Sequence, residues 1–179
     1  MELKRVVVTG LGAVTPVGNS PEETWSNLLA GKSGAAPITN FDPALFKTQF
    51  ACEVKGLNIN DWIDRKEARK LDRYTQFAMI SAMQGVKDAA LDLEKEDLNR
   101  IGVVFGVGIG GIKTFEDEVI YYGNNRENGP KFSPFFIPKM IADIASGHIS
   151  IHFGFHGPNY TTTSACASSP NALADAFNL

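Results

Sequence analysis

The stretch that decides the fold is TTTSACASSPNALADAFNL, residues 161–179. Residues 160–163 form a short run of β-prone side chains, and small residues surround the lone Cys166 that follows. A helical pattern then runs through Leu173 and Phe177. A strand that turns directly into a helix indicates an α/β fold, and a thiol at such a junction is a candidate nucleophile.

The rest of the chain alternates strands and helices in the same way. Residues 5–9 and 101–105 are continuous apolar runs typical of buried strands, and residues 49–54 form a weaker strand pattern. Helical patterns are predicted at residues 20–31, 66–91, 114–122 and 140–152. This order of elements predicts a layered α/β domain.

Two of the helices carry specific expectations. Ser20 as N-cap, Pro21 at the first position and Glu23 closing a capping box give the first helix a clear start. We expect its apolar side chains to face inward: Trp25, Leu28 and Leu29. The pattern at residues 66–91 is the longest, and its second half is apolar nearly all round, so we expect burial on several sides.

Composition and charge exclude several classes of protein. Hydrophobic residues make up 44% and charged residues 21% of the 179 residues, which is typical of one globular domain. The formal charge of −3 argues against a nucleic-acid partner, and no apolar run reaches the roughly 18 residues of a membrane helix. Residues 1–5 lack the apolar core of a signal peptide, and two cysteines form no disulfide framework, so we expect a cytoplasmic protein.

The helical pattern near the end of the sequence has no stop signal before Leu179. We therefore expect the chain to be part of a longer protein.

Two motifs resemble ligand sites without meeting their requirements. His148, His152 and His156 follow helical spacing, but a Phe-Gly-Phe run ends the helix before the third, so no metal site is predicted. GVGIGG, residues 106–111, matches a dinucleotide fingerprint, but Glu127, about 20 positions later, lies in a polar tip and not at the end of a strand. A nucleotide-binding dehydrogenase remains an alternative. We expect these glycines to let the backbone turn and pack closely.

Cys166 has the surroundings that a catalytic thiol needs. Its small neighbours leave room for a substrate and let backbone N–H groups approach a developing oxyanion, and a helix N-terminus beside it would favour thiolate over thiol. Two helix starts are open: near Cys166, or at Pro170 with Ser169 as N-cap, which would move the thiol a turn away. A buried structural cysteine is the alternative for Cys166 and the expectation for Cys52, which lies mid-strand between apolar neighbours.

Residues 163–169, TSACASS, closely resemble the nucleophile segment of the β-ketoacyl-[acyl carrier protein] synthases, the condensing enzymes of fatty-acid elongation. The resemblance continues in RVVVTGLGAVTPVGN, RKEARKLDRYTQFAMISA, GVGIGGIKTFED and SPFFIPKMIADIASGHISIHFGFHGPNYTTTSACAS, and is nearest to the synthase II branch. It implies a thiolase-like fold of five layers, α-β-α-β-α, built from two similar halves. Residues 1–179 would be the N-terminal half, with a long insertion near residues 106–138 and the C-terminal half absent.

The resemblance also implies roles for individual residues. Cys166 would accept the growing acyl group as a thioester, its backbone N–H would supply half of the oxyanion hole, and a malonyl-loaded carrier protein would then condense with loss of CO₂. Ile109, Phe135 and Phe136 match positions that line the acyl pocket, a phenylalanine reaching it from the partner subunit of a homodimer. No cofactor is implied, because the acyl carrier protein carries the phosphopantetheine. The family's catalytic histidines and lysine lie in its second half, so this chain alone is not expected to complete the condensation.

A basic cluster completes the expectations. Lys66, Arg69 and Lys70 lie at i, i+3 and i+4, and match positions that meet the acidic acyl carrier protein, with Arg65 and Arg73 as weaker members. Taken without the resemblance, such a cluster is usually a solvated helix face. Two alternatives to the synthase stay open: a polyketide-type ketosynthase of the same fold, and a non-catalytic fragment that associates through exposed apolar surface.

Overall fold

Short strands and helices alternate along the chain. The computed structural model describes residues 5–179; residues 1–4, where most of the signal-peptide expectation falls, lie outside the described residues. Single 3₁₀ turns connect several elements: Ile59–Asp61, Leu98–Arg100, Arg126–Asn128 and Ala165–Ala167. In the described part of the chain, no helix combines the length and the apolar content needed to cross a membrane.

Two parallel strands form the centre of the fold. β3 (Val103–Gly106) pairs with β4 (Asn159–Thr162), and Gly106 lies opposite Thr162 at the end of the pair. The strands predicted at residues 101–105 and 160–163 are therefore confirmed, each shifted by one or two positions. Because the strands are parallel, their carboxyl ends meet at the same edge of the sheet.

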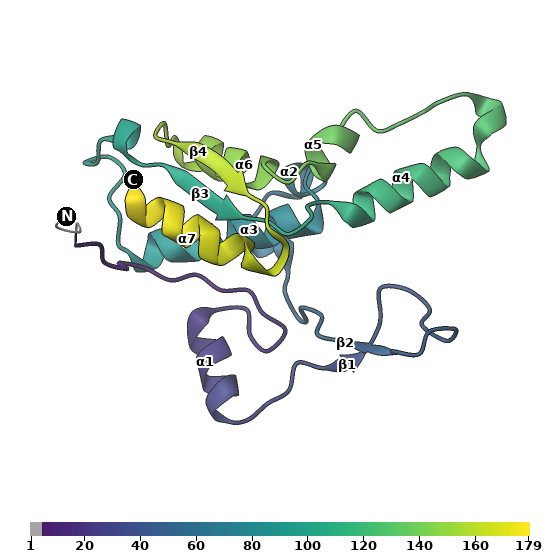
Figure 1. Ribbon diagram of the computed structural model, residues 1–179, viewed down its shortest axis with the longest axis horizontal. Helices are drawn as coiled ribbons and strands as arrows, with labels where there is room; N and C mark the ends of the chain where they lie inside the picture. The colour runs from purple at the N-terminus through teal and green to yellow at the C-terminus, as the bar shows by residue number, and fades with distance from the viewer. Residues whose placement is uncertain (1–4) are drawn as a thin grey trace.

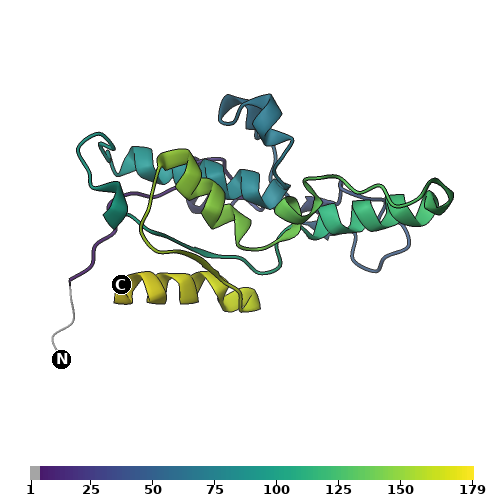
Figure 2. The same cartoon turned by 90° about the horizontal axis from the view of Figure 1, so that it is seen from above.

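Helices cover both faces of this strand pair. α7 (Ser168–Asn178) packs on one face, and α6 (Ile144–Phe153), backed by α3 (Arg73–Asp88), packs on the other (Figure 2). The resulting α-β-α layering confirms the α/β class predicted from the order of elements. The helix predicted at residues 140–152 is α6, and the helical pattern that is open at Leu179 begins at Ser168.

The hydrophobic core lies between α3, α6 and β3. Ile80 of α3 and Ala145 of α6 are both 0% exposed, and Met79, Val103 and Ile149 surround them. The sequence predicted burial for the second half of the 66–91 pattern, and this core confirms it. Removal of this apolar surface from water is the main stabilising contribution to the layer.

The single helix predicted for residues 66–91 is in fact two helices. α2 (Arg65–Ala68) is one turn long, and α3 begins at Arg73 because Asp72 caps it. The Asp72 carboxylate accepts a hydrogen bond from the Tyr74 N–H at 3.1 Å. An aspartate at this position stabilises a helix start by about 1 kcal/mol, which favours a break here over a continuous helix.

The N-terminal region lies beside the layered core (Figure 1). α1 (Pro21–Leu29) starts as predicted, with the Ser20 hydroxyl accepting a hydrogen bond from the Glu23 N–H at 3.2 Å. β1 (Ala36–Pro37) and β2 (Phe50–Ala51) form a short antiparallel pair. The strand predicted at residues 49–54 is thus present but only two residues long.

Two predictions for the N-terminal region are wrong. Residues 5–9 form no strand, and Val6, Val7 and Val8 are 53%, 61% and 79% exposed. The apolar side chains of α1, expected to face inward, are also exposed: Trp25, Leu28 and Leu29. An apolar pattern indicates which side chains gain from burial, but burial also requires a second surface that packs against them. Residues 5–179 do not supply such a surface at these positions.

A helical arm leaves the core after β3. α4 (Ile112–Asn124) projects away from the layers, and α5 (Phe136–Met140) returns the chain to them (Figure 1). Phe136 stacks on Phe115 and Phe132, with ring centroids 6.3 and 5.6 Å away. The helix predicted at residues 114–122 is α4, and these aromatic contacts order part of the segment that the sequence marks as an insertion.

Replacing Ile80 tests the position of the core. We expect Ile80→Ala to lower the free energy of unfolding by about 2–5 kcal/mol, because the side chain is fully buried and its removal leaves a cavity. Leu45→Ala is the matched control, since Leu45 is 99% exposed. Urea unfolding followed by circular dichroism measures both. Equal stability of the two variants would place the core elsewhere.

Candidate active site

Cys166 lies in a tight turn between β4 and α7, here called the Cys166 turn (residues 164–167). It is exposed, so the buried structural cysteine considered as an alternative is wrong for this residue. The turn is one 3₁₀ turn, closed by a hydrogen bond from the Ala167 N–H to the Ser164 carbonyl at 3.0 Å. The thiol is therefore exposed to solvent just after β4, at the same edge of the sheet where β3 ends.

Of the two non-glycine residues with a left-handed backbone in the described chain, Ala90 and Ala165, the second lies beside the thiol. Ala165 has a φ of +50°, a left-handed conformation that costs a residue with a side chain about 1–2 kcal/mol. Such strain persists only where surrounding contacts hold it, and it often marks functional sites. The contacts that hold Ala165 are therefore part of the site.

α7 starts between the two positions that the sequence left open. Its first residue is Ser168, which places Pro170 at the third helical position and Cys166 two residues before the helix. The first four N–H groups of a helix have no intrahelical partner, so the missing N–H of Pro170 costs no hydrogen bond there. The thiol thus stays within one turn of the helix N-terminus.

Ser168 is the most highly connected residue near the thiol. It is 3% exposed, and its Oγ accepts a hydrogen bond from the Ser164 N–H at 2.9 Å. The same Oγ lies 2.7 Å from the Ala165 carbonyl oxygen and 3.2 Å from that of Val107. Its carbonyl accepts a hydrogen bond from the Thr162 hydroxyl at 2.7 Å. Ser168 therefore joins the Cys166 turn to both strands.

The glycine turn, residues 106–111, packs against this region. A Cβ on Gly106 would lie 2.5 Å from the carbonyl carbon and oxygen of Ser168, so only glycine allows α7 to approach β3 this closely. Gly110 has a φ of +97°, and the Gly111 N–H donates to the Met140 carbonyl at 3.0 Å. These contacts fit the packing role expected for the glycines.

The predicted acyl-pocket residues lie on two elements. Ile109, 71% exposed, lies in the glycine turn. Phe136 is the first residue of α5, and Phe135 immediately precedes it. The contact between Gly111 and Met140 joins the glycine turn to the C-terminal end of α5. The assignment of Ile109, Phe135 and Phe136 to an acyl pocket stays a prediction.

The predicted basic cluster divides into two parts. Lys70 forms an ion pair with Glu67, with Lys70 Nζ 2.6 Å from Glu67 Oε1. Arg65, Arg69 and Arg73 line a surface hollow of about 450 Å³, to which α5 adds Lys139. The positive charge around this hollow exceeds what the sequence cluster indicated, because Lys139 is distant in the chain.

Cys52 differs from its prediction. It is exposed and lines a hollow of about 1180 Å³ with the rings of Phe41, Phe46 and Phe77. The expected burial is wrong because β2 ends at Ala51, which leaves Cys52 beyond the strand pair. The hollow lies between the β1–β2 hairpin and the starts of α3 and α4.

The three histidines are arranged as the sequence indicated. α6 ends at Phe153, so His148 and His152 lie on the helix and His156 lies beyond it. Residues 5–179 hold no cluster of three or more histidine, cysteine or acidic side chains able to bind a metal ion. His148 is half-buried, and burial lowers the pKa of its imidazole, an effect that the charge of Glu67 partly opposes.

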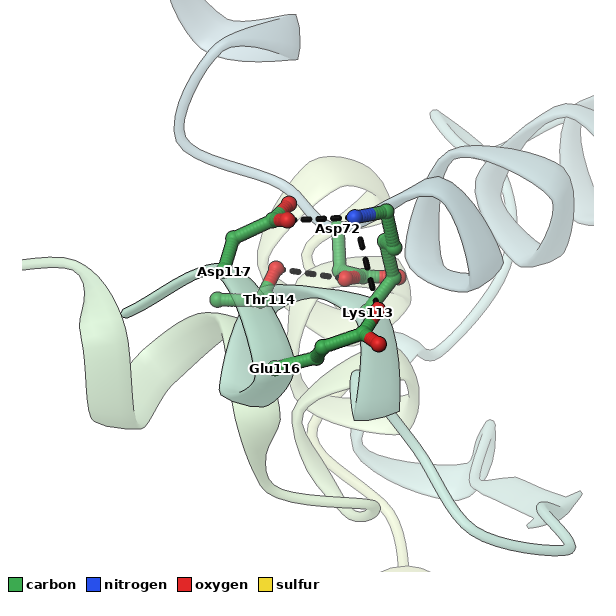
Figure 3. A network of polar contacts seen from close by, with 5 residues as sticks. All are labelled: Asp72, Lys113, Thr114, Glu116 and Asp117. Carbon is green, nitrogen blue, oxygen red and sulfur yellow. Dashed lines mark hydrogen bonds and ion pairs between the residues drawn. The ribbon is translucent and has the colours of Figure 1, made fainter. Parts of the chain in front are cut away.

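Sequence reasoning missed Asp72 and Ser168. The buried Asp72 carboxylate accepts a hydrogen bond from the Thr114 hydroxyl at 2.5 Å, which fixes the start of α4 against the start of α3 (Figure 3). Lys113 beside it pairs with Asp117 and Glu116 on α4. An aspartate is a preferred N-cap, and that signal could have located the break before α3. Nothing in the run of small residues distinguishes Ser168 from Ser169.

Comparison with known proteins places this geometry in a family. A family model described as the beta-ketoacyl synthase N-terminal domain matches residues 3–179. The 3-oxoacyl-[acyl-carrier-protein] synthase 2 of Staphylococcus aureus (strain COL) is 46% identical over 177 residues, which cover 98% of this chain and 42% of that relative. The chain therefore spans about two fifths of the length of this relative.

Solved structures show the same fold. A beta-ketoacyl synthase from Burkholderia phymatum aligns with a TM-score of 0.80 at 22% identity, over 98% of this chain and 43% of that one. The ishigamide ketosynthase/chain length factor aligns with a TM-score of 0.76 at 28% identity, over 92% and 40%. The chain has the thiolase-like fold of these ketosynthases and covers less than half of each.

The depressed pKa of His148 predicts a pH effect on stability. As pH falls below the ordinary histidine value of 6.5, the unfolded chain takes up a proton at this position before the folded chain does. The free energy of unfolding should therefore fall between about pH 7 and pH 5, and His148→Gln should remove part of that fall. His152→Gln, at an exposed position, is the control. Identical pH profiles for wild type and His148→Gln would show that burial does not affect this histidine.

Proposed function

The chain belongs to the beta-ketoacyl synthase family, and from that premise we propose that it forms the acyl-accepting half of a 3-oxoacyl-carrier-protein synthase. In the first step the Cys166 thiolate attacks the thioester carbonyl of an acyl group on carrier-protein phosphopantetheine. A new thioester forms on Cys166, the old carbon–sulfur bond breaks, and the pantetheine thiol leaves with a proton. A malonyl-loaded carrier protein then loses CO₂ and attacks the acyl-cysteine, which elongates the chain.

The placement of Cys166 is the observation that carries this proposal. The thiol is exposed at the carboxyl ends of two parallel strands, within one turn of the N-terminus of α7. Ligands of open α/β folds bind in this region, and a helix N-terminus favours negative charge. The Cys166 backbone N–H would supply one donor to the oxyanion of the transfer step.

The second step draws on groups outside residues 1–179. We propose that the decarboxylating histidines and their lysine, which the family resemblance implies, lie outside the 42% of the relative that this chain covers. We therefore propose acyl acceptance for this chain and the full condensation for the complete enzyme. The reaction needs no cofactor bound to the protein, since the carrier protein brings the phosphopantetheine.

The helical arm is proposed to form the acyl pocket with a second subunit. Ile109 would border the pocket on one subunit, and Phe135 or Phe136 would reach it from the partner of a homodimer. Exposed apolar side chains along the arm support an unpaired surface there: Ile112, Phe115, Val119, Ile120 and Ile137. An apolar surface of this kind is typical of a protein–protein contact.

The acyl carrier protein is the proposed partner in the cytoplasm. Arg65, Arg69 and Arg73 at the basic hollow would offer positive charge to its acidic surface. The exposed Lys66 would add to this charge, whereas Lys70 is partly engaged by Glu67. Charge complementarity of this kind mainly raises the rate of association. A polyketide ketosynthase is the second candidate, supported by the 28% identity to the ishigamide ketosynthase/chain length factor.

Intact-mass measurement tests the nucleophile. After mixing with a carrier protein loaded with a long-chain acyl group, the wild-type chain should gain the mass of one acyl group in place of the thiol hydrogen. Cys166→Ser should remain at its own mass, because a serine hydroxyl is far less nucleophilic than a thiolate. Cys52→Ser is the matched control and should be acylated like wild type. Acylation of Cys166→Ser would reject the assignment.

Charge reversal tests the docking surface. Arg69→Glu should lower the second-order rate constant of acyl transfer about three- to tenfold, because it repels the acidic carrier protein, and the loss should shrink at high salt. Lys95→Glu makes the same change at an exposed position far along the chain. A similar loss for both variants would indicate a general charge effect and no specific docking surface.

A further inference from the structure

We propose that Ser168 is a positioning residue for Cys166, a role that rests on the proposed function. The Ser168 hydroxyl lies where three backbone groups converge: the Ser164 N–H and the carbonyls of Ala165 and Val107. These groups come from the Cys166 turn and from the glycine turn. A single buried side chain thus connects the segment that carries the thiol with the segment that carries Ile109.

The hydrogen-bonding capacity of a hydroxyl matches this arrangement. Serine has one proton to donate and two lone pairs to accept. Oγ accepts from the Ser164 N–H at 2.9 Å and directs its proton to the Ala165 carbonyl at 2.7 Å, with the Val107 carbonyl at 3.2 Å as a second acceptor. Both strong contacts thus reach the residues that immediately precede Cys166.

These contacts account for the strain at Ala165. The left-handed backbone at this residue, φ +50°, aims the Ala165 carbonyl at Ser168. Without the hydroxyl, the Ser164 N–H would lose this partner, and the Ala165 carbonyl would keep only the hydrogen bond from the Ser168 backbone N–H. A relaxed Ala165 would then turn the following residue, Cys166.

The backbone of Ser168 is itself held by other contacts, so the position of its hydroxyl is fixed. The Thr162 hydroxyl donates to its carbonyl at 2.7 Å, and Gly106 packs directly against the same peptide group. Ser168 therefore sets the position of the thiol relative to β3 and β4. Ser169, one residue on, is exposed and takes part in none of these hydrogen bonds, so it provides a matched control.

The first test asks whether the hydrogen bond exists in solution. Amide hydrogen exchange measured by NMR should show the Ser164 N–H exchanging about fivefold faster or more in Ser168→Ala, and unchanged in Ser169→Ala. Protection of Ser164 that is equal in all three proteins would overturn the proposal.

The second test asks whether the contact positions the thiol. In Ser168→Ala, the rate constant of acyl transfer to Cys166 should fall about tenfold or more, with the KM for the acyl carrier protein unchanged, because small displacements of a nucleophile cost rate. A purely structural loss of folded protein would lower the amount of active chain and not this rate constant in single-turnover measurements. A transfer rate equal to wild type would overturn the proposal.

Two further measurements keep the outcome decisive. If Ser168→Ala does not fold, Ser168→Thr is compared with Ser168→Val, which has nearly the same shape as threonine but no hydroxyl. The proposal requires a higher rate constant of acyl transfer in Ser168→Thr than in Ser168→Val.

If the wild type takes no acyl group, the proposed function fails, and the positioning role is tested by the rate of Cys166 alkylation by iodoacetamide in a Cys52→Ser background. Ser168→Ala must then change that rate more than about threefold while Ser169→Ala does not.

Discussion

Gly106 lies opposite Thr162 where two parallel strands end, and the surroundings of the thiol follow from this pairing. The glycine turn leaves β3 and the Cys166 turn leaves β4 at the same edge, because parallel strands share the direction of their ends. The bare backbone of Gly106 then lets the first turn of α7 rest on β3. Without this close approach, the Ser168 hydroxyl would not reach the Val107 carbonyl, and the two turns would be independent.

Local signals in the sequence predicted much of this arrangement. An apolar run indicated β3, a β-prone run indicated β4, and the capping residues indicated the start of α1. The small residues around Cys166 indicated that the thiol has free space around it. Each of these features depends on neighbours in the chain. The break before α3 was missed although its signal, an aspartate N-cap at Asp72, is also local, because the apolar pattern on both sides suggested one continuous helix.

Features that depend on distant partners were not predictable in the same way. The sequence gives no reason to distinguish Ser168 from Ser169. The packing of α7 against Gly106 buries Ser168 and leaves Ser169 exposed. Likewise, Lys139 joins the arginines of the basic hollow through the return of α5. For Val7 and Trp25 the sequence predicted burial that the structure does not show. Both side chains are exposed, because no other part of the described chain packs against them.

The spacing of β3 and β4 along the chain has a consequence for folding kinetics. Val103 pairs with Asn159, so 159 − 103 = 56 positions separate the partners, and the whole helical arm lies between them. Closing such a long loop costs entropy before any strand contact compensates for it, whereas α3 and α6 can form from local contacts. We therefore expect the sheet, and with it the fixed backbone of Ser168 beside the thiol, to form late in folding. Until the sheet forms, Cys166 lies on a flexible chain and has no fixed position relative to the glycine turn.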